Sequence, residues 1–190
     1  RDFSRSLPGH VSVLLDEALV EFAGEGASCV GLVDELPNLL VFRSFSKAWA
    51  MAGLRVGYAL GSTADADLLG VLTPGQGVAS PAQAAVAAAL EDAGRARLRL
   101  QLRRTAAAQE RARLHEALAG TPFAFDRSEV HVVWLRGEGM TAAQITHGLA
   151  GQRIHVEPGA AWDDDDHVRV TLRDRAATER LAAALRILVT

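Results

Sequence analysis

The first part of the chain alternates short apolar runs with turn-forming residues, a pattern that is typical of buried strands. Such runs occupy residues 10–16, 39–44 and 54–60. Residues 17–36 begin with a helix-like stretch that breaks at glycines. Strands rich in Val and Leu that are joined by helical crossovers predict a mostly parallel sheet with helices on both faces. We therefore predict an α/β fold for this part.

From Ser80 onwards the pattern changes to long helical stretches. Ser80 precedes a proline, and this pair predicts a helix whose first turn is capped by the serine hydroxyl. The alanine- and arginine-rich run that follows predicts helix to about Leu118, with a break near Gly94. Thr141 and Gln144 have the spacing of a capping box, which predicts the start of another helix.

Three further strands and a closing helix complete the second part. The predicted strands are residues 129–135, 153–156 and 167–172. The closing helix carries Leu181, Leu185 and Leu188 on one stripe. We therefore predict two domains: residues 1–78 form an α/β unit, and residues 79–190 form a linking helix and a small α+β domain.

Composition narrows the class of protein. With 190 residues and 49% hydrophobic residues, the chain can bury a core, and its net charge of −3 gives no global attraction to nucleic acid or to an anionic membrane. No apolar run approaches the roughly 20 residues that cross a bilayer. The single cysteine, Cys29, excludes an internal disulfide framework. Without a recognisable signal peptide, the sequence predicts a soluble, cytoplasmic protein.

The use of basic residues is uneven. Nineteen of the 20 basic residues are arginines, and Lys47 is the one lysine. A lysine amine can lose its proton and act as a nucleophile, whereas arginine stays charged. This makes Lys47 a candidate for amine chemistry, although a plain surface charge remains the alternative.

Other polar residues cluster around Lys47 in the predicted fold. Asp16 ends the first predicted strand, and Lys47 lies just past the end of the second. The carboxyl ends of parallel strands face the ligand crevice of an α/β sheet, so these two groups are expected to converge. Ser44, Ser46 and Arg55 provide two hydroxyls and a guanidinium, which suit a phosphate monoester. An amine, a phosphate cradle and a carboxylate are what pyridoxal 5'-phosphate requires.

Three segments also resemble a known family. Residues 44–58 resemble the lysine-bearing signature of the fold-type I, class I/II aminotransferases, most closely that of the histidinol-phosphate aminotransferases. Residues 14–22 are similar to the segment that carries the aspartate that binds the pyridine nitrogen. Residues 167–171 are similar to the segment whose arginine binds the acidic group of the substrate. The fold this implies is part of the large domain of a pyridoxal-phosphate transferase, followed by a small α+β C-terminal domain.

The resemblance implies roles for the residues singled out above. Lys47 would form a Schiff base with pyridoxal 5'-phosphate and carry the proton that moves during the reaction. Asp16 would hold the pyridine nitrogen, the two serines and Arg55 the phosphate, and Arg169 the substrate carboxylate. The implied reaction is transamination between an amino-acid donor, of the histidinol-phosphate or aromatic type, and a 2-oxo acid. The resemblance also implies a homodimer.

Three departures from the family pattern are visible. Leu19 stands where the family has a tyrosine, and Glu157 stands where histidinol-phosphate enzymes have an arginine for the substrate phosphate. A carboxylate repels a phosphate dianion. Family chains also extend further on the N-terminal side, so we expect these residues to be the second half of a catalytic domain with its small domain, and to bind the cofactor poorly on their own.

Several alternatives stay open at this stage. A pyridoxal-phosphate-dependent amino-acid phosphate decarboxylase could use the same scaffold, and the chain could be a truncated module without catalysis. The arginines between residues 95 and 113 are interspersed with glutamates, which favours a solvated helix face over a nucleic-acid interface. The acidic run 163–166 lacks calcium-loop spacing, so we predict an exposed loop and no metal site.

Overall fold

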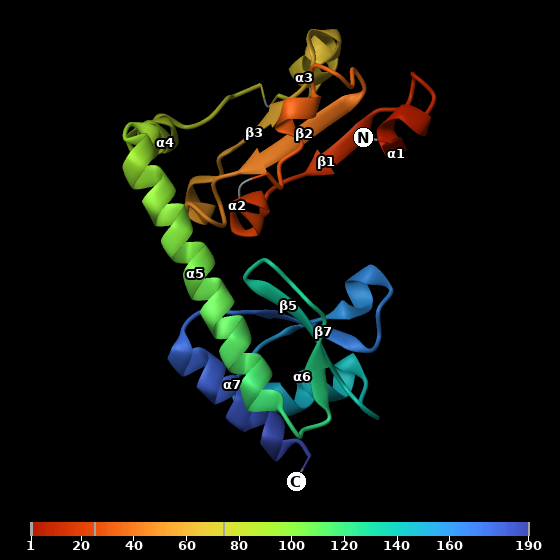
Figure 1. The fold of residues 1–190 in the computed structure, drawn as a ribbon, viewed down its shortest axis with the longest axis vertical. Helices are drawn as coiled ribbons and strands as arrows, with labels where there is room; N and C mark the ends of the chain where they lie inside the picture. Colours follow the sequence, from red (N-terminus) through yellow and green to blue (C-terminus); the bar gives the residue numbers. More distant parts are fainter. Residues whose placement is uncertain (1, 25, 74, 190) are drawn as a thin grey trace. The chain divides into compact units, whose positions relative to one another are not determined.

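The computed structural model describes residues 2–24, 26–73 and 75–189. The chain divides into two compact units, Arg1–Gln101 and Leu102–Thr190 (Figure 1). The dividing point falls within the long helix α5 (Ala93–Leu118). The functional division at residues 78 and 79 stays a prediction.

The first unit contains a three-stranded sheet in the order β1-β2-β3. β1 (Val13–Asp16) pairs in parallel with β2 (Leu39–Ser44), and β2 pairs antiparallel with β3 (Gly57–Leu60). The expectation of a mostly parallel sheet is therefore wrong, because the short loop that carries Lys47 returns the chain beside β2 in the opposite direction. The sheet is mixed.

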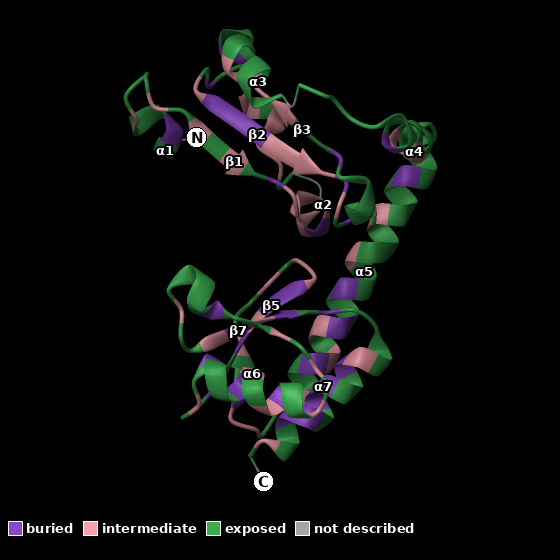
Figure 2. Cartoon of the chain, turned by 180° about the vertical axis from the view of Figure 1, so that it is seen from behind, coloured by how far each residue is buried: buried purple, intermediate pink, exposed green. Residues whose placement is uncertain are grey.

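The central strand β2 carries the core of this unit. Leu39, Leu40 and Val41 are almost fully buried, and the first half of β2 is drawn as buried in Figure 2. Leu36, Leu39 and Val41 form one cluster with apolar residues of β1 and of the 3-10 turn η1 (Val30–Leu32). Successive strand residues point to opposite faces. Leu14 of β1 therefore lies on the other face, where it is 61% exposed.

The helices of the first unit are short. They are α1 (Asp2–Ser6), α2 (Val20–Ala23), α3 (Ala66–Leu72) and α4 (Ser80–Leu90), with 3-10 turns η2 (Ala52–Leu54) and η3 (Thr63–Asp65) between them. The helix-like stretch expected within residues 17–36 is reduced to α2, which ends at Gly24 with a φ of 96°. The expected serine cap is also wrong: Ala79 is the N-cap of α4 and Ser80 lies inside the helix.

The second unit contains a four-stranded antiparallel sheet in the order β4-β5-β7-β6. The strands are β4 (Phe123–Phe125), β5 (Val132–Gly137), β6 (Glu157–Pro158) and β7 (His167–Thr171). β4 has no counterpart among the predicted strands. The strand expected at residues 153–156 is wrong, because only the next two residues pair with β7. The short 3-10 turn η4 (Gly159–Trp162) follows β6.

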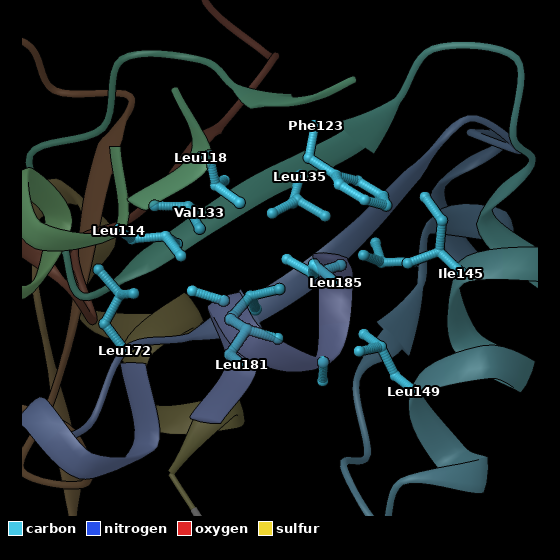
Figure 3. Packing of buried hydrophobic residues seen from close by; sticks show 14 of the residues in the cluster. Leu114, Leu118, Phe123, Val133, Leu135, Ile145, Leu149, Leu172, Leu181 and Leu185 are labelled. Carbon is cyan, nitrogen blue, oxygen red and sulfur yellow. The ribbon is translucent and has the colours of Figure 1, made fainter. Parts of the chain in front are cut away.

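One face of this sheet packs against helices to form the larger core (Figure 3). The helices are α5, α6 (Ala142–Gly151) and α7 (Arg175–Ile187). Leucines from all three helices fill the core: Leu114 of α5, Leu149 of α6 and Leu185 of α7 are fully buried. The predicted capping box is present, since the side chains of Thr141 and Gln144 each bond the other residue's main-chain N–H. Among the described helices, none combines the length and the apolar character that crossing a bilayer requires.

We predict that Leu185→Ala lowers the free energy of unfolding of the second unit by about 2–5 kcal/mol, because it leaves a cavity in a closed core. Native-state hydrogen exchange of the buried amides in α7 and β5 measures this loss. Ile187→Ala is the matched control on the same helix, because Ile187 is 62% exposed and its loss should change little. Equal effects of the two substitutions would contradict the packing described here.

Candidate active site

The carboxyl ends of β1 and β2 form the first part of the candidate site. Asp16 pairs with Phe42 in the parallel register, so Asp16, Phe42 and, two residues on, Ser44 share one face of the sheet. A hollow of about 380 Å³ opens here, and both Asp16 and Ser44 line it. The Asp16 Oδ1 atom accepts a hydrogen bond from the main-chain N–H of Ala18 at 2.8 Å, which fixes the carboxylate at the strand end.

The loop between β2 and β3 carries Lys47. Phe45 anchors this loop from both sides: its N–H donates to the Val56 carbonyl at 3.1 Å, and its carbonyl accepts from Met51 N–H at 3.0 Å. The Phe45 side chain is buried in a small cluster with Val56 and Ala82. Lys47 itself is exposed. The apolar anchor therefore holds the main chain of the loop while it leaves the amine accessible.

The loop contains two unusual backbone conformations. Ala50 and Arg55 have φ angles of 59° and 53°, in the left-handed region that side chains other than glycine rarely adopt. The Arg55 Nη1 atom donates to the Ala52 carbonyl at 2.9 Å across this turn. Such conformations persist where the surrounding structure holds them, and they concentrate at functional sites. The surrounding structure therefore holds this loop in its tight conformation.

Gly57 allows β3 to approach β2 beside Ser44. The two residues are register partners, and a Cβ added at Gly57 would lie 2.7 Å from the Arg43 carbonyl oxygen. A side chain at this position would push the strands apart. The hydroxyl of Ser44 accepts a hydrogen bond from the main-chain N–H of Ser46 at 3.1 Å, and this bond links the two serines where the loop leaves β2.

The structure thus brings some of the predicted residues together. Asp16 and Ser44 line one hollow, and Ser46 is bonded to Ser44. Lys47 and Arg55 are exposed on the loop that leaves the same strand end. Arg169 belongs to the second unit, on β7. The roles assigned to these residues stay predictions.

A buried ionic network next to the site was not foreseen from the sequence. The Arg43 Nε atom donates to Glu17 Oε2 at 3.0 Å, and its Nη1 atom lies 3.6 Å from Glu21 Oε1. Ser28 lies between these charges: its hydroxyl donates to Glu17 at 2.9 Å and accepts from Arg43 Nη2 at 2.6 Å. The side chain of Glu17 is only 5% exposed. The network therefore ties together the residues directly adjacent to Asp16 and Ser44.

The sequence does contain a signal for this network, namely the alternation of side-chain direction along β1 and β2. Glu17 follows Asp16 and Arg43 precedes Ser44. Neighbouring residues of a strand point to opposite faces, so Glu17 and Arg43 are expected on the face opposite to Asp16 and Ser44, which is the covered face of the sheet. A buried charge needs a partner, and these two residues are register neighbours at the strand ends.

Arg169 lies in a polar row across the second sheet. Its register partners are Trp134 of β5 and Glu157 of β6. The Arg169 Nη1 atom is 4.0 Å from Glu157 Oε2, and the guanidinium carbon is 6.0 Å from the centre of the Trp162 ring. Trp162 meets Trp134 edge to face, with ring centroids 5.2 Å apart. Glu157, which departs from the family pattern, is thus beside the arginine expected to bind substrate.

The acidic loop at residues 163–166 is mostly exposed, as expected. Asp164 accepts from both the N–H and the ring of His167, at 3.1 and 2.9 Å. The hydrogen bond from the His167 side chain is the main cause that lowers the pKa of the Asp164 carboxyl below its ordinary value. Among the described residues, no group of three His, Cys, Asp or Glu side chains is placed to hold a metal ion.

Comparison with known proteins identifies the family. The family model described as aminotransferase class I and II matches residues 5–185, so this chain belongs to that family. A histidinol-phosphate aminotransferase 2 of Pseudomonas fluorescens is 37% identical over 188 residues, which is 97% of this chain and 49% of the relative.

Two further comparisons agree with this membership. An aromatic amino acid aminotransferase of Mycobacteroides abscessus is 37% identical over 90% of this chain and 47% of the relative. The crystal structure of a histidinol-phosphate aminotransferase from Sinorhizobium meliloti in complex with pyridoxal-5'-phosphate superposes with a TM-score of 0.82 and 28% identity. It covers 99% of this chain, which covers 51% of that structure. The chain spans about half the length of the curated relatives it matches.

We predict that Arg43→Met destabilises the first unit by about 3 kcal/mol, because it leaves the Glu17 carboxylate buried without its cation. The double variant Glu17→Met with Arg43→Met also removes the Glu17 charge and should recover part of that loss, because Glu21, the second carboxylate beside Arg43, stays in place. Native-state hydrogen exchange of the β2 amides measures both. A double variant at least as unstable as Arg43→Met would contradict the assignment.

We predict that His167→Ala raises the pKa of Asp164 towards its ordinary value, because the side-chain hydrogen bond that favours the carboxylate is lost. The stabilisation from this bond is present above the ordinary pKa of an aspartate and is lost as pH falls through the lowered one. Carboxyl carbon NMR measures the midpoint. His155→Ala, which removes an exposed histidine elsewhere in the unit, should leave that midpoint in place.

Proposed function

We propose that the protein carrying this chain is an aminotransferase that uses pyridoxal 5'-phosphate, with Lys47 as the covalent attachment point. The observation that carries the proposal is that Asp16 and Ser44 line the same hollow. Ser44 is the last residue of β2, the strand that leads directly into the loop with Lys47. Membership in the class I and II aminotransferase family supports the reaction type.

The residues at this strand end fit the chemical parts of that cofactor. The carboxylate of Asp16 suits a protonated ring nitrogen, which it would keep charged. The hydroxyls of Ser44 and Ser46, together with the guanidinium of Arg55, suit a phosphate monoester. When bound, the cofactor supplies an electron-withdrawing ring that stabilises negative charge at the substrate's α-carbon.

Within this site, Lys47 would have two tasks. Its amine would bond to the cofactor's aldehyde carbon and, once a substrate amine takes its place, would be free to move a proton from the α-carbon. The anchored loop allows this, because Phe45 holds the main chain while the Lys47 side chain stays exposed. Arg169 would hold the substrate carboxylate, for which a guanidinium offers two parallel donors.

The surroundings of Arg169 favour an aromatic amino donor over a phosphorylated one. Glu157 lies 4.0 Å from Arg169 and would repel a second anionic group on the substrate. The exposed ring of Trp162 lies beside the same arginine and offers an apolar surface. The acceptor would be a 2-oxo acid. Family resemblance also carries our proposals of a homodimer and of a cytoplasmic location.

We predict that sodium borohydride fixes one pyridoxyl group on the chain after incubation with saturating pyridoxal 5'-phosphate, which offsets the weak binding expected of the chain on its own, and that Lys47→Ala removes this adduct. Because Lys47 is the one lysine, peptide mass spectrometry distinguishes it from the terminal amine without further labelling. Lys47→Arg is the matched control that keeps the charge and should also lose the adduct. An adduct that persists in both variants would exclude Lys47 as the attachment point.

The natural polypeptide that carries this chain provides the activity test. We predict that it converts phenylalanine and 2-oxoglutarate to phenylpyruvate and glutamate, and that Lys47→Ala lowers this rate by at least about a hundredfold. Release of carbon dioxide from amino-acid phosphates without any 2-oxo acid product would instead support a decarboxylase. If the polypeptide catalysed neither transamination nor decarboxylation, the proposed function would be wrong.

A further inference from the structure

The second unit contains a large hollow that extends beyond Arg169 and Glu157, the two of its residues to which the proposed reaction gives a role. Its volume is about 540 Å³, within the range of small-molecule sites. Four arginines and His155 line it, against a single carboxylate, that of Glu157. This concentration of positive charge stands out in a chain whose net charge is −3.

The hollow forms where two antiparallel segments separate. Glu157 and Arg169 are register partners, and in the antiparallel direction the residues that precede Glu157 run beside those that follow Arg169. The same register, if continued, would place Arg153 opposite Arg173 and His155 opposite Thr171, and all four residues line the hollow. Pairing with β7 is confined to Glu157 and Pro158, so the two segments diverge and leave space between them.

Arg180 of α7 fixes the shape of this end of the hollow. Its Nη2 atom donates to the carbonyls of Gln152 and Arg153, at 3.0 and 3.2 Å. These two bonds bracket a turn in which Arg153 has a φ of 59°, in the left-handed region. The contacts use one nitrogen of the Arg180 guanidinium and leave its other N–H groups available to a ligand.

The charges at this end are not neutralised by the protein. Within residues 2–24, 26–73 and 75–189, the side chains of Arg153 and Arg173 form neither an ion pair nor a hydrogen bond. Arg169 differs, because Glu157 lies 4.0 Å from it. The charges of Arg153 and Arg173 are therefore less compensated than that of Arg169, the arginine assigned to the substrate carboxylate.

We infer that Arg153, Arg173 and Arg180 form a second binding site, for the phosphate group of a small phosphorylated molecule. Guanidinium groups bind the oxygens of a phosphate dianion through pairs of charge-assisted hydrogen bonds. Arg173 lies four positions beyond Arg169, up to about 13 Å away in extended backbone. Arg169 is already engaged by Glu157, whereas Arg153 and Arg173 have no ion pair among the described residues, so we assign the phosphate to these two arginines and Arg180 and not to Arg169. This site involves neither Lys47 nor any cofactor.

The test is an NMR titration of this chain with inorganic phosphate at constant ionic strength. We expect saturable shifts of the Arg153 and Arg173 amides. In the double variant Arg153→Gln with Arg173→Gln, the affinity should fall at least about tenfold. Arg180 is left in place so that the turn it supports is preserved. Thermal unfolding checks that each variant remains folded.

The matched control is Arg127→Gln with Arg136→Gln, which removes the same charge from exposed positions of the same unit outside the hollow. Its phosphate affinity should stay within about twofold of the parent. Equal weakening in both double variants would show diffuse attraction only and overturn the proposal. Absence of saturable binding in the parent chain would overturn it too. Loss of binding in Arg169→Gln alone would assign the phosphate to the substrate arginine and reject a second site.

Discussion

The ion pair between Glu17 and Arg43 is the interaction on which the candidate site depends. It joins the ends of β1 and β2 on the covered face of the sheet, while Asp16 and Ser44 occupy the opposite face. An Arg–carboxylate contact of 3.0 Å between largely buried groups tolerates little displacement, because each charge would lose its nearest partner of opposite sign in a poorly hydrated environment. The ion pair thereby fixes the spacing between Asp16 and Ser44, two of the residues that line the hollow.

The strands were predictable where burial alone determines them. Residues 39–44 were expected as a strand and form β2 with the same bounds, because an uninterrupted apolar run suits a strand buried on both faces. Sequence reasoning failed where tertiary contacts decide. Residues 153–156 have strand composition, but they follow a turn that Arg180 bonds, and pairing with β7 begins only at Glu157. Ser80 has the residue type of a cap, yet the helix begins one position earlier than that role requires.

The candidate site was predictable to a similar extent. The positions of Asp16 and Ser44 follow from the rule that the carboxyl ends of parallel strands meet, and the structure places both on one hollow. The Glu17–Arg43 network was missed because glutamate and arginine normally occupy positions that are exposed to solvent. Their burial becomes visible only when the alternation of β1 and β2 is combined with the register between the two strands. The pairing of Glu157 with Arg169 likewise required the register of β6 and β7, which the sequence left open.

The exposed side of β1 has a consequence for how the first sheet can grow. In the part of the chain that the structure describes, β1 pairs with β2 along one edge only. The main-chain N–H and C=O groups along its other edge can accept an extended segment, and Leu14 offers that segment an apolar contact. The strand that ends in Asp16 is therefore also the strand along which a further polypeptide segment can be added, so that enlargement of the sheet would take place directly beside the hollow.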